Sequence, residues 1–433
     1  MSYFILPNNT NNIEINTFAP FTNYNIDQTE TEIYDSTIIS HSLYNYYNII
    51  KSQLLHLTYK GYEHQKQDQT DHDNHEQEDI NQYNSMDEKF QFLIKIMHPF
   101  EQIDTITKIN LNITTAPNVL INKPQTYHLK QHYNILFYDM IEIIQSHNLL
   151  LIFAELPFIK AIHIGPKLIE NYQYLSHIRN NPLDKYFYFY EDTGADLNYL
   201  FHYIFYDIID DITTTAAATT TIATTNTTIN EKDMKKYVIQ FVKAIMFILK
   251  CQMAGGICVI KITHIFYKPI IDFIYMLTIL YEKVMIVKPS TSNPILFDKY
   301  IVCKGFIGKN TEKYYSDLNE WYSYFISSNN AIVAVEPPPD NPHNDNTSTS
   351  KTEHHFSPIK NIIPLYFLNK LNDINIILGQ KQLDVLDQLI YILKNKYMDN
   401  KIELIRKQNM QTCSLWCKKY KLFSIFLLFR KFT

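Results

Sequence analysis

Apolar positions alternate between helical and strand-like spacing along the middle of the chain. An apolar stripe at helical spacing predicts a helix over 133–146, and the continuous apolar run over 149–154 is typical of a buried parallel strand. Strands that alternate with helices indicate an α/β domain with a mostly parallel sheet. The later predicted elements are strands over 186–190, 257–262, 284–287 and 299–304, and helices over 231–251 and 269–283.

Three polar stretches interrupt this pattern, at 61–88, 213–230 and 336–358. Each is too polar or too low in sequence complexity to bury a face, so we interpret all three as disordered surface loops. The predicted organisation is a mainly helical region over 1–119, the α/β domain over 120–310 and a mainly helical region over 311–433.

The chain has 433 residues, of which 46% are hydrophobic and only 8 are glycine. It contains no G-x-x-x-x-G-K-[ST], G-x-G-x-x-G or G-x-S-x-G motif. These absences argue against a P-loop NTPase, an ordinary dinucleotide-binding domain and an α/β-hydrolase. The formal net charge of -5 excludes a globally basic nucleic-acid binder and leaves a local basic groove as the option for RNA.

The five cysteines are an odd number without framework spacing, which predicts a reducing, cytoplasmic environment. Cys413 and Cys417 lie one helical turn apart without a further pair at zinc spacing, so no metal site is expected. The first residues lack the character of a signal peptide, and no apolar run approaches the roughly 20 residues of a membrane span. The apolar tail over 421–430 fits either a buried terminal element or an interfacial segment.

Ligand sites in open α/β sheets lie beyond the carboxyl ends of the strands, so the residues that follow each predicted strand are the candidates. The run over 149–154 leads into Glu155-Leu-Pro-Phe158, and the strand over 186–190 leads into Asp192-Thr-Gly194. A Gly255-Gly256 turn after the long helix leads into a strand that ends in Lys261-Ile. The last block runs from Lys288-Pro-Ser-Thr-Ser through Asp298 to Gly305-Phe.

This ordered set of blocks resembles the FtsJ-like family of S-adenosylmethionine-dependent RNA ribose 2′-O-methyltransferases. It is most similar to the divergent versions carried by large nucleocytoplasmic DNA viruses, including those of asfarviruses and mimiviruses. The resemblance covers roughly 120–310, and its most specific part is the last block, where the family pattern is K-P-x-x-S-R-x-x-x-S-E-x-Y-x-V-x-x-G-F. It implies a Rossmann-like methyltransferase sheet with helical N- and C-terminal additions.

The resemblance also implies a catalytic site. The family uses a Lys-Asp-Lys-Glu tetrad to orient the ribose hydroxyl and ease loss of its proton. By motif position, Lys261 matches the central lysine, Asp192 the aspartate, and Asp298 stands in place of the glutamate. Asp139 occupies the position of the first lysine, and Asn293 that of the arginine in the last block, so two family cations are missing. Without the resemblance, Lys261 would be a strand-end lysine that reaches solvent, Asp192 a turn residue and Asp298 a loop acid.

The cofactor loop implied by the resemblance is Glu155, Leu156, Pro157 and Phe158. The family pattern there is E-x-P-G-G-F, and both glycines are absent from this chain. Glycines let a backbone approach a ligand closely, so their loss predicts a distorted or closed pocket.

Two functional hypotheses follow. The first is an RNA 2′-O-methyltransferase that acts on viral mRNA, at the cap, with partners in a capping complex and a location in the host cytoplasm or virion. The second is a catalytically inactive methyltransferase-fold subunit that binds RNA or protein and has lost S-adenosylmethionine.

Overall fold

The computed structural model describes part of the chain. The described ranges are 1–10, 42–43, 45–46, 49–50, 52–53, 93–100, 103, 135–149, 160–165, 187–190, 200–208, 231–263, 265–333, 363–395 and 399–420. The predicted surface loops, the segments 150–159 and 191–199 and the tail after 420 lie outside them.

The described strands form one seven-stranded sheet in the order β1-β6-β7-β5-β4-β2-β3. Strands β3, β2, β4 and β5 are parallel, whereas β7 is antiparallel to both of its neighbours, β5 and β6. The bounds are β1 Ser2–Ile5, β2 Ala161–Ile164, β3 Phe187–Tyr190, β4 Phe201–Asp207, β5 Gln252–Ile262, β6 Tyr281–Lys288 and β7 Lys299–Phe306.

The parallel strands have a doubly wound order. Without the antiparallel β1 and β7, the sheet reads 2-1-3-4-5 in chain order, one of the two common doubly wound arrangements. The chain leaves β2 toward one edge of the sheet and leaves β4 toward the other, so the topological switch point lies between β2 and β4. Ligands of such sheets bind in the crevice outside the carboxyl ends of the strands at this point.

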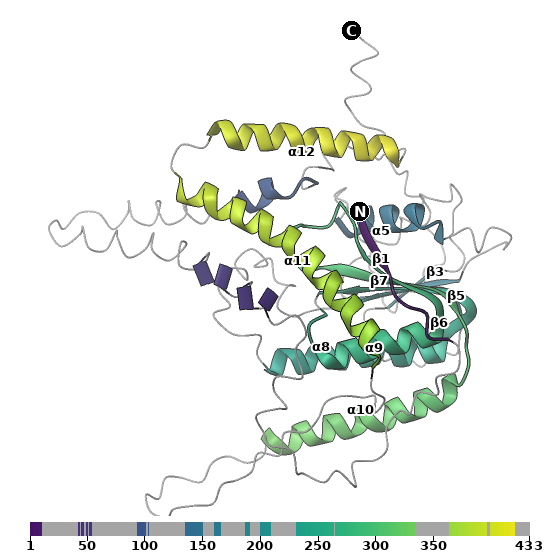
Figure 1. Cartoon of the computed structure of the whole chain (residues 1–433). Helices are drawn as coiled ribbons and strands as arrows, with labels where there is room; N and C mark the ends of the chain where they lie inside the picture. The colour runs from purple at the N-terminus through teal and green to yellow at the C-terminus, as the bar shows by residue number, and fades with distance from the viewer. Residues whose placement is uncertain are drawn as a thin grey trace, which may run out of the picture.

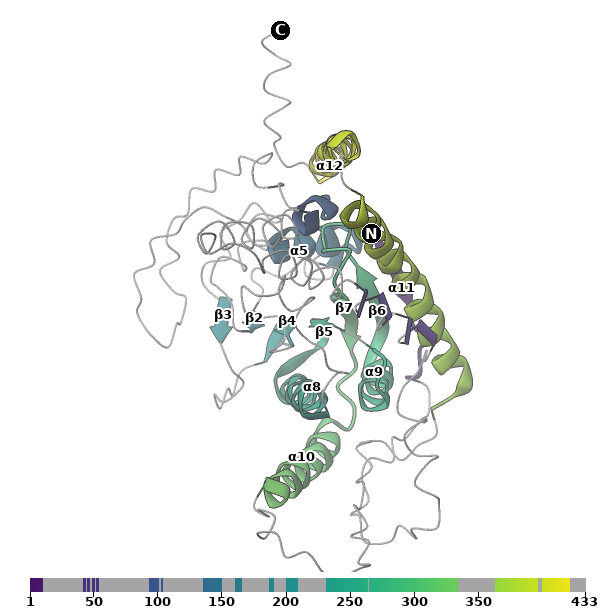
Figure 2. The same ribbon diagram turned by 90° about the vertical axis from the view of Figure 1, so that its left-hand side faces the viewer.

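Helices cover both faces of the sheet (Figure 2). Helices α8 (Glu231–Cys251) and α9 (Lys268–Leu280) pack on one face, and α10 (Thr311–Val333) packs against α8. Helices α5 (Ile135–Ser146) and α12 (Asp399–Lys419) share a hydrophobic cluster with the other face. Helix α11 (Leu365–Lys394) runs from the α9 side past the sheet to α12 (Figure 1).

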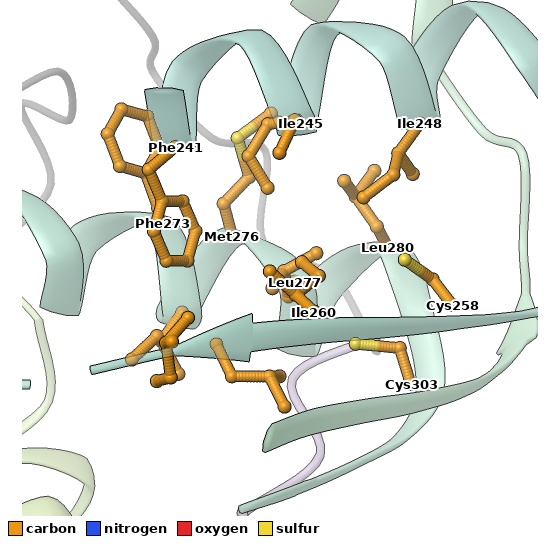
Figure 3. Packing of buried hydrophobic residues seen from close by; sticks show 14 of the residues in the cluster. Phe241, Ile245, Ile248, Cys258, Ile260, Phe273, Met276, Leu277, Leu280 and Cys303 are labelled. Atoms are coloured by element: carbon orange, nitrogen blue, oxygen red, sulfur yellow. The ribbon is translucent and has the colours of Figure 1, made fainter. Parts of the chain in front are cut away.

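The larger core lies between the sheet and the α8–α9 layer. Phe241 of α8 stacks on Phe273 of α9 with ring centroids 5.6 Å apart, and Ile260 of β5 lies beneath them (Figure 3). Residues 257–260 of β5 are fully buried without interruption, as expected of a strand that is covered on both faces. This core fixes the direction of β5 and therefore the position of the residues at its carboxyl end.

The hydrophobic pattern predicts many of these elements correctly. Helices α5 and α8 and strand β3 are confirmed, and α9, β6 and β7 are present with shifted ends. Of the predicted strand over 149–154, only Leu149 is described, and it lies in a helical turn. The hydrophobic pattern does not predict strands β1, β2 and β4. Strand β2 begins at Ala161, shortly after the cofactor loop that the resemblance implies.

The predicted Gly-Gly turn is wrong, because residues 253–256 lie inside β5 as an irregularity in its pairing with β4. Phe201 pairs with Gln252, and Tyr203 pairs with Ile257. Residues 253–256 of β5 therefore bulge opposite the single residue 202 of β4. Gly255 has a φ of 73° there, which favours glycine. The missing side chain of Gly256 leaves room for the Gln252 amide, which donates to the Phe201 carbonyl at 3.0 Å.

Candidate functional site

Lys261 lies between two carboxylates at the carboxyl edge of the sheet. Its Nζ is 3.6 Å from Oδ1 of Asp207 and 3.8 Å from Oδ2 of Asp298. Asp207 is the last residue of β4 and the register partner of Lys261 on β5, whereas Asp298 directly precedes β7. The antiparallel direction of β7 places its beginning beside the end of β5. Three separate strands therefore bring these charges together.

The surrounding carboxylates determine the charge of Lys261. Burial disfavours the ammonium form, but the negative charges of Asp207 and Asp298, with a further contribution from Asp139, outweigh burial and raise the pKa of Lys261 above its ordinary value. A general base near neutral pH needs an amine whose pKa is lowered. Lys261 is therefore suited to orient a hydroxyl group and to stabilise negative charge on its oxygen.

The structure brings together two of the three catalytic residues predicted from the motifs, Lys261 and Asp298. The third, Asp192, lies outside the described residues, and β3, which ends at Tyr190, is separated from β5 by β2 and β4. Asp207 is not among the residues that the motifs select. The signal that could have found it is the apolar and aromatic run over 201–206, which reads as a buried strand and ends at this aspartate. Glu155, Leu156, Pro157 and Phe158 also lie outside the described residues.

Gly165 keeps Asp207 in place. It directly follows β2, and a Cβ atom at this position would lie only 2.7 Å from the Cβ of Asp207. Any side chain would therefore displace Asp207, and with it the carboxylate that pairs with Lys261. The ends of β2 and β4 approach closely at the switch point because of this glycine.

The loop over 289–298, between β6 and β7, is fixed by two buried carboxylates of α5. Asp139 accepts hydrogen bonds from the hydroxyls of Thr291, Ser292 and Tyr300. Glu142 accepts one from the Ser290 hydroxyl at 2.6 Å. Glu142 also accepts from the Ser290 amide at 3.1 Å and from the Trp416 indole of α12 at 3.0 Å. Serine and threonine hydroxyls in the loop thus serve as donors to acids on a helix.

A buried lysine fixes the other end of the same loop. Lys288 donates from Nζ to the carbonyls of Asn293, Leu296 and Asp298, at 3.1, 2.8 and 2.6 Å. The Gln382 amide of α11 donates to the Ile295 carbonyl at 2.5 Å. Contacts from α5, β6 and α11 therefore hold the loop in one conformation, and Asp298 with it.

Asp139 has a structural role that the motif comparison did not indicate. It is 2% exposed, and burial raises its pKa, while the hydrogen bonds from Thr291, Ser292 and Tyr300 act in the opposite direction. The acid at the position of the family's first lysine thus anchors the loop. Asn293, at the position of the family arginine, also serves the loop, because its Oδ1 accepts the Ile295 amide at 2.9 Å.

The cysteines show no site chemistry. All five are free and buried, and burial raises the pKa of Cys413 to about 12 and that of Cys417 to about 11, so neither is a thiolate at neutral pH. Within the described ranges, no group of His, Cys, Asp and Glu side chains could hold a metal ion. None of the helices in the described part of the chain is long and apolar enough to cross a membrane.

No protein-family model matches the chain, and no curated protein matches it either.

The role of Asp139 predicts the effect of its removal on stability. Asp139→Ala removes the carboxylate that accepts from three buried hydroxyls, so we expect a loss of about 2–4 kcal/mol in the free energy of unfolding. Urea denaturation measures this loss. Asp387→Ala, at an exposed position of α11, is the control and should change stability by less than about 0.5 kcal/mol. Equal effects of the two substitutions would contradict the anchoring role.

The contact between Gly165 and Asp207 predicts an energetic coupling. Gly165→Ala should cost about 1–3 kcal/mol of stability, because the added methyl group overlaps Asp207. In an Asp207→Gly background the overlap is gone, and the same substitution should cost clearly less. A double-mutant cycle by denaturant unfolding measures the difference. Additive costs would show that the two residues do not crowd each other.

Proposed function

We propose that the chain is an FtsJ-like RNA ribose 2′-O-methyltransferase whose site contains Asp207, Lys261 and Asp298. The observation that carries this proposal is the ammonium group of Lys261 held between two carboxylates at the carboxyl edge of a doubly wound sheet. The lysine and Asp298 are the residues that the motifs select. Asp207 replaces Asp192 as the proposed aspartate, because it lies within ion-pair distance of the lysine.

S-adenosylmethionine would supply a methyl group already activated for transfer. Its proposed place is the switch point between β2 and β4, with Glu155, Leu156, Pro157 and Phe158 as the proposed contact loop. At the end of β2, the space beside Gly165 is occupied by Asp207, whose carboxylate pairs with Lys261. A cofactor at this point would therefore lie next to the proposed catalytic groups.

The residues of the site would act on the acceptor hydroxyl. The ammonium group of Lys261 donates a hydrogen bond to the 2′-oxygen and stabilises the negative charge that develops there, while Asp207 and Asp298 fix its direction. The ammonium cannot also accept the hydroxyl proton. That proton therefore passes to water, which reaches this edge because the Lys261 side chain is 26% exposed.

The proposed acceptor is the ribose of capped viral mRNA, with partner proteins of a capping complex in the host cytoplasm or virion. This acceptor follows from the resemblance alone.

A second candidate function is a catalytically inactive subunit that binds RNA or protein. The observation that favours it is Asp139. Asp139 stands at the position of the family's first lysine, is buried, and accepts hydrogen bonds from Thr291 and Ser292 of the loop. The site of this chain therefore lacks the first of the two lysines in the family's tetrad.

Cofactor binding separates the two functions. We expect calorimetry to detect S-adenosylmethionine binding to the full chain if the first proposal is correct. Lys261→Ala should then leave cofactor binding nearly intact and abolish methyl transfer to capped RNA, because it removes the group that orients the hydroxyl. Lys283→Ala, an exposed lysine on β6, should retain both properties. Absence of binding at high cofactor concentration would rule out the methyltransferase and favour the inactive subunit. Methyl transfer by the Lys261→Ala variant would show that Lys261 is not the catalytic lysine.

The charge of Lys261 predicts a pH profile. Because its pKa is raised, Lys261 remains an ammonium group between about pH 7 and about pH 9. A rate that depends on the ammonium form should be nearly constant over this range in single-turnover methyl transfer. A rate that rises about tenfold per pH unit would show instead that the neutral amine acts as the base.

A further inference from the structure

A second polar site lies beside the loop between β6 and β7. A pocket of about 190 Å³ opens there, and the residues that line it do not include Lys261, Asp207 or Asp298. The lining residues that matter are Lys288 and Lys299 from the strands, Ser292 and Phe297 from the loop, and Lys381 and Gln382 from α11.

The described wall of this pocket is basic. Three lysines line it, Lys288, Lys299 and Lys381, and none of the described lining residues is a carboxylate. Lys299 is only 3% exposed, and its Nζ donates to the Thr263 carbonyl at 2.6 Å. An ammonium group has three protons to donate, so this bond leaves Lys299 with further donor capacity toward an anion. Lys381 is exposed at the rim.

The two buried lysines carry an electrostatic cost that an anion would relieve. Burial lowers the pKa of Lys299 to about 7, and the nearby charge of Lys288 contributes to this shift. Burial also lowers the pKa of Lys288 to about 8, although Asp298 and Asp139 act in the opposite direction. An anion in the pocket would favour the charged form of both lysines.

The size and stiffness of the pocket restrict its ligand. Pockets for whole small molecules measure roughly 300–1,000 Å³. This smaller pocket suits a single polar group with part of what is attached to it. The loop that forms its floor is held by α5, Lys288 and Gln382, so little order is lost when a ligand binds.

We propose that this pocket binds the terminal phosphate group of a nucleotide, with Lys299 as the buried cation and Lys381 as the cation at the rim. Lysine binds phosphate as a point charge, and the Phe297 ring offers an apolar surface to the attached sugar or base. The site stands apart from methyl transfer, because the pocket is defined without the cofactor and without Lys261. The two sites meet at Asp298, whose carbonyl accepts from Lys288 and whose carboxylate pairs with Lys261.

Calorimetry with inorganic pyrophosphate and the full chain, without S-adenosylmethionine, tests this proposal. We expect measurable binding that weakens with added salt. Lys299→Gln should weaken binding roughly tenfold to a hundredfold, as expected for loss of a charge-assisted hydrogen bond. Lys394→Gln, at an exposed position on α11 outside the pocket, is the matched control and should bind as the parent chain does.

A second variant keeps the test decisive if Lys299→Gln does not fold. Lys381 is exposed and its Nζ donates to the Ser2 hydroxyl at 2.8 Å. Lys381→Glu reverses the charge at the rim, so it should weaken binding severalfold. Absence of pyrophosphate binding by the parent chain at millimolar concentration would overturn the proposal. If both variants fold, unchanged pyrophosphate binding in both would also overturn the proposal. If Lys299→Gln does not fold, unchanged binding in Lys381→Glu would overturn it.

The source of the phosphate is distinguished by two further titrations. A nucleoside 5′-diphosphate and a short oligoribonucleotide with a 5′-phosphate are compared, each in the parent chain and in Lys381→Glu. Tighter binding of the oligonucleotide than of its 5′-hydroxyl counterpart supports an RNA end, and preference for the diphosphate supports a free nucleotide. Equal binding of the 5′-phosphate and 5′-hydroxyl oligonucleotides, together with no binding of the diphosphate, would contradict a phosphate site.

Discussion

The buried carboxylates of α5 are the constraint on which both sites depend. Asp139 and Glu142 lose their hydration on folding, and the hydroxyl, amide and indole donors that replace water come from the loop after β6 and from α12. A buried acid without such partners would be strongly unfavourable, so the loop has one conformation that satisfies it. That conformation places Asp298 at the end of β5, directly before Lys299, which lines the neighbouring pocket.

Two lysines at this edge of the sheet, Lys261 and Lys299, differ in pKa because their surroundings differ. Lys261 faces two carboxylates and remains charged, whereas Lys299 has lost more hydration and lies near another lysine. Burial acts to lower the pKa of both lysines. The carboxylates outweigh burial at Lys261, whereas at Lys299 burial prevails and the charge of Lys288 adds to it. This contrast is why we assign Lys261 to charge stabilisation at a hydroxyl and Lys299 to an anion, rather than treating the basic residues as one surface.

The sequence predicts elements well where the pattern is long and regular, and poorly where a short segment depends on its partners. The stripe of α8 defines that helix to the residue, because its 21 positions carry the helical period throughout. The short strand β2 has four residues and no distinctive pattern, and β1 pairs with a strand far along the chain. For the site, motif spacing selected Lys261 and Asp298. It could not select Asp207, because that choice depends on which strand lies next to β5, a property of sheet order.

The position of β7 has a consequence for the order in which the site forms. It lies between β5 and β6 although it follows both in the chain, so those two strands cannot complete the sheet when they are first synthesised. Non-local pairing of this kind is slow relative to local helix formation. Asp298 reaches Lys261 only when β7 pairs between β5 and β6. Until then, Asp207 is the only one of the two carboxylates that lies beside the lysine. A nascent or partly folded chain would hold a helix-covered half-sheet without a finished site, and any ligand of that edge would recognise only the complete fold.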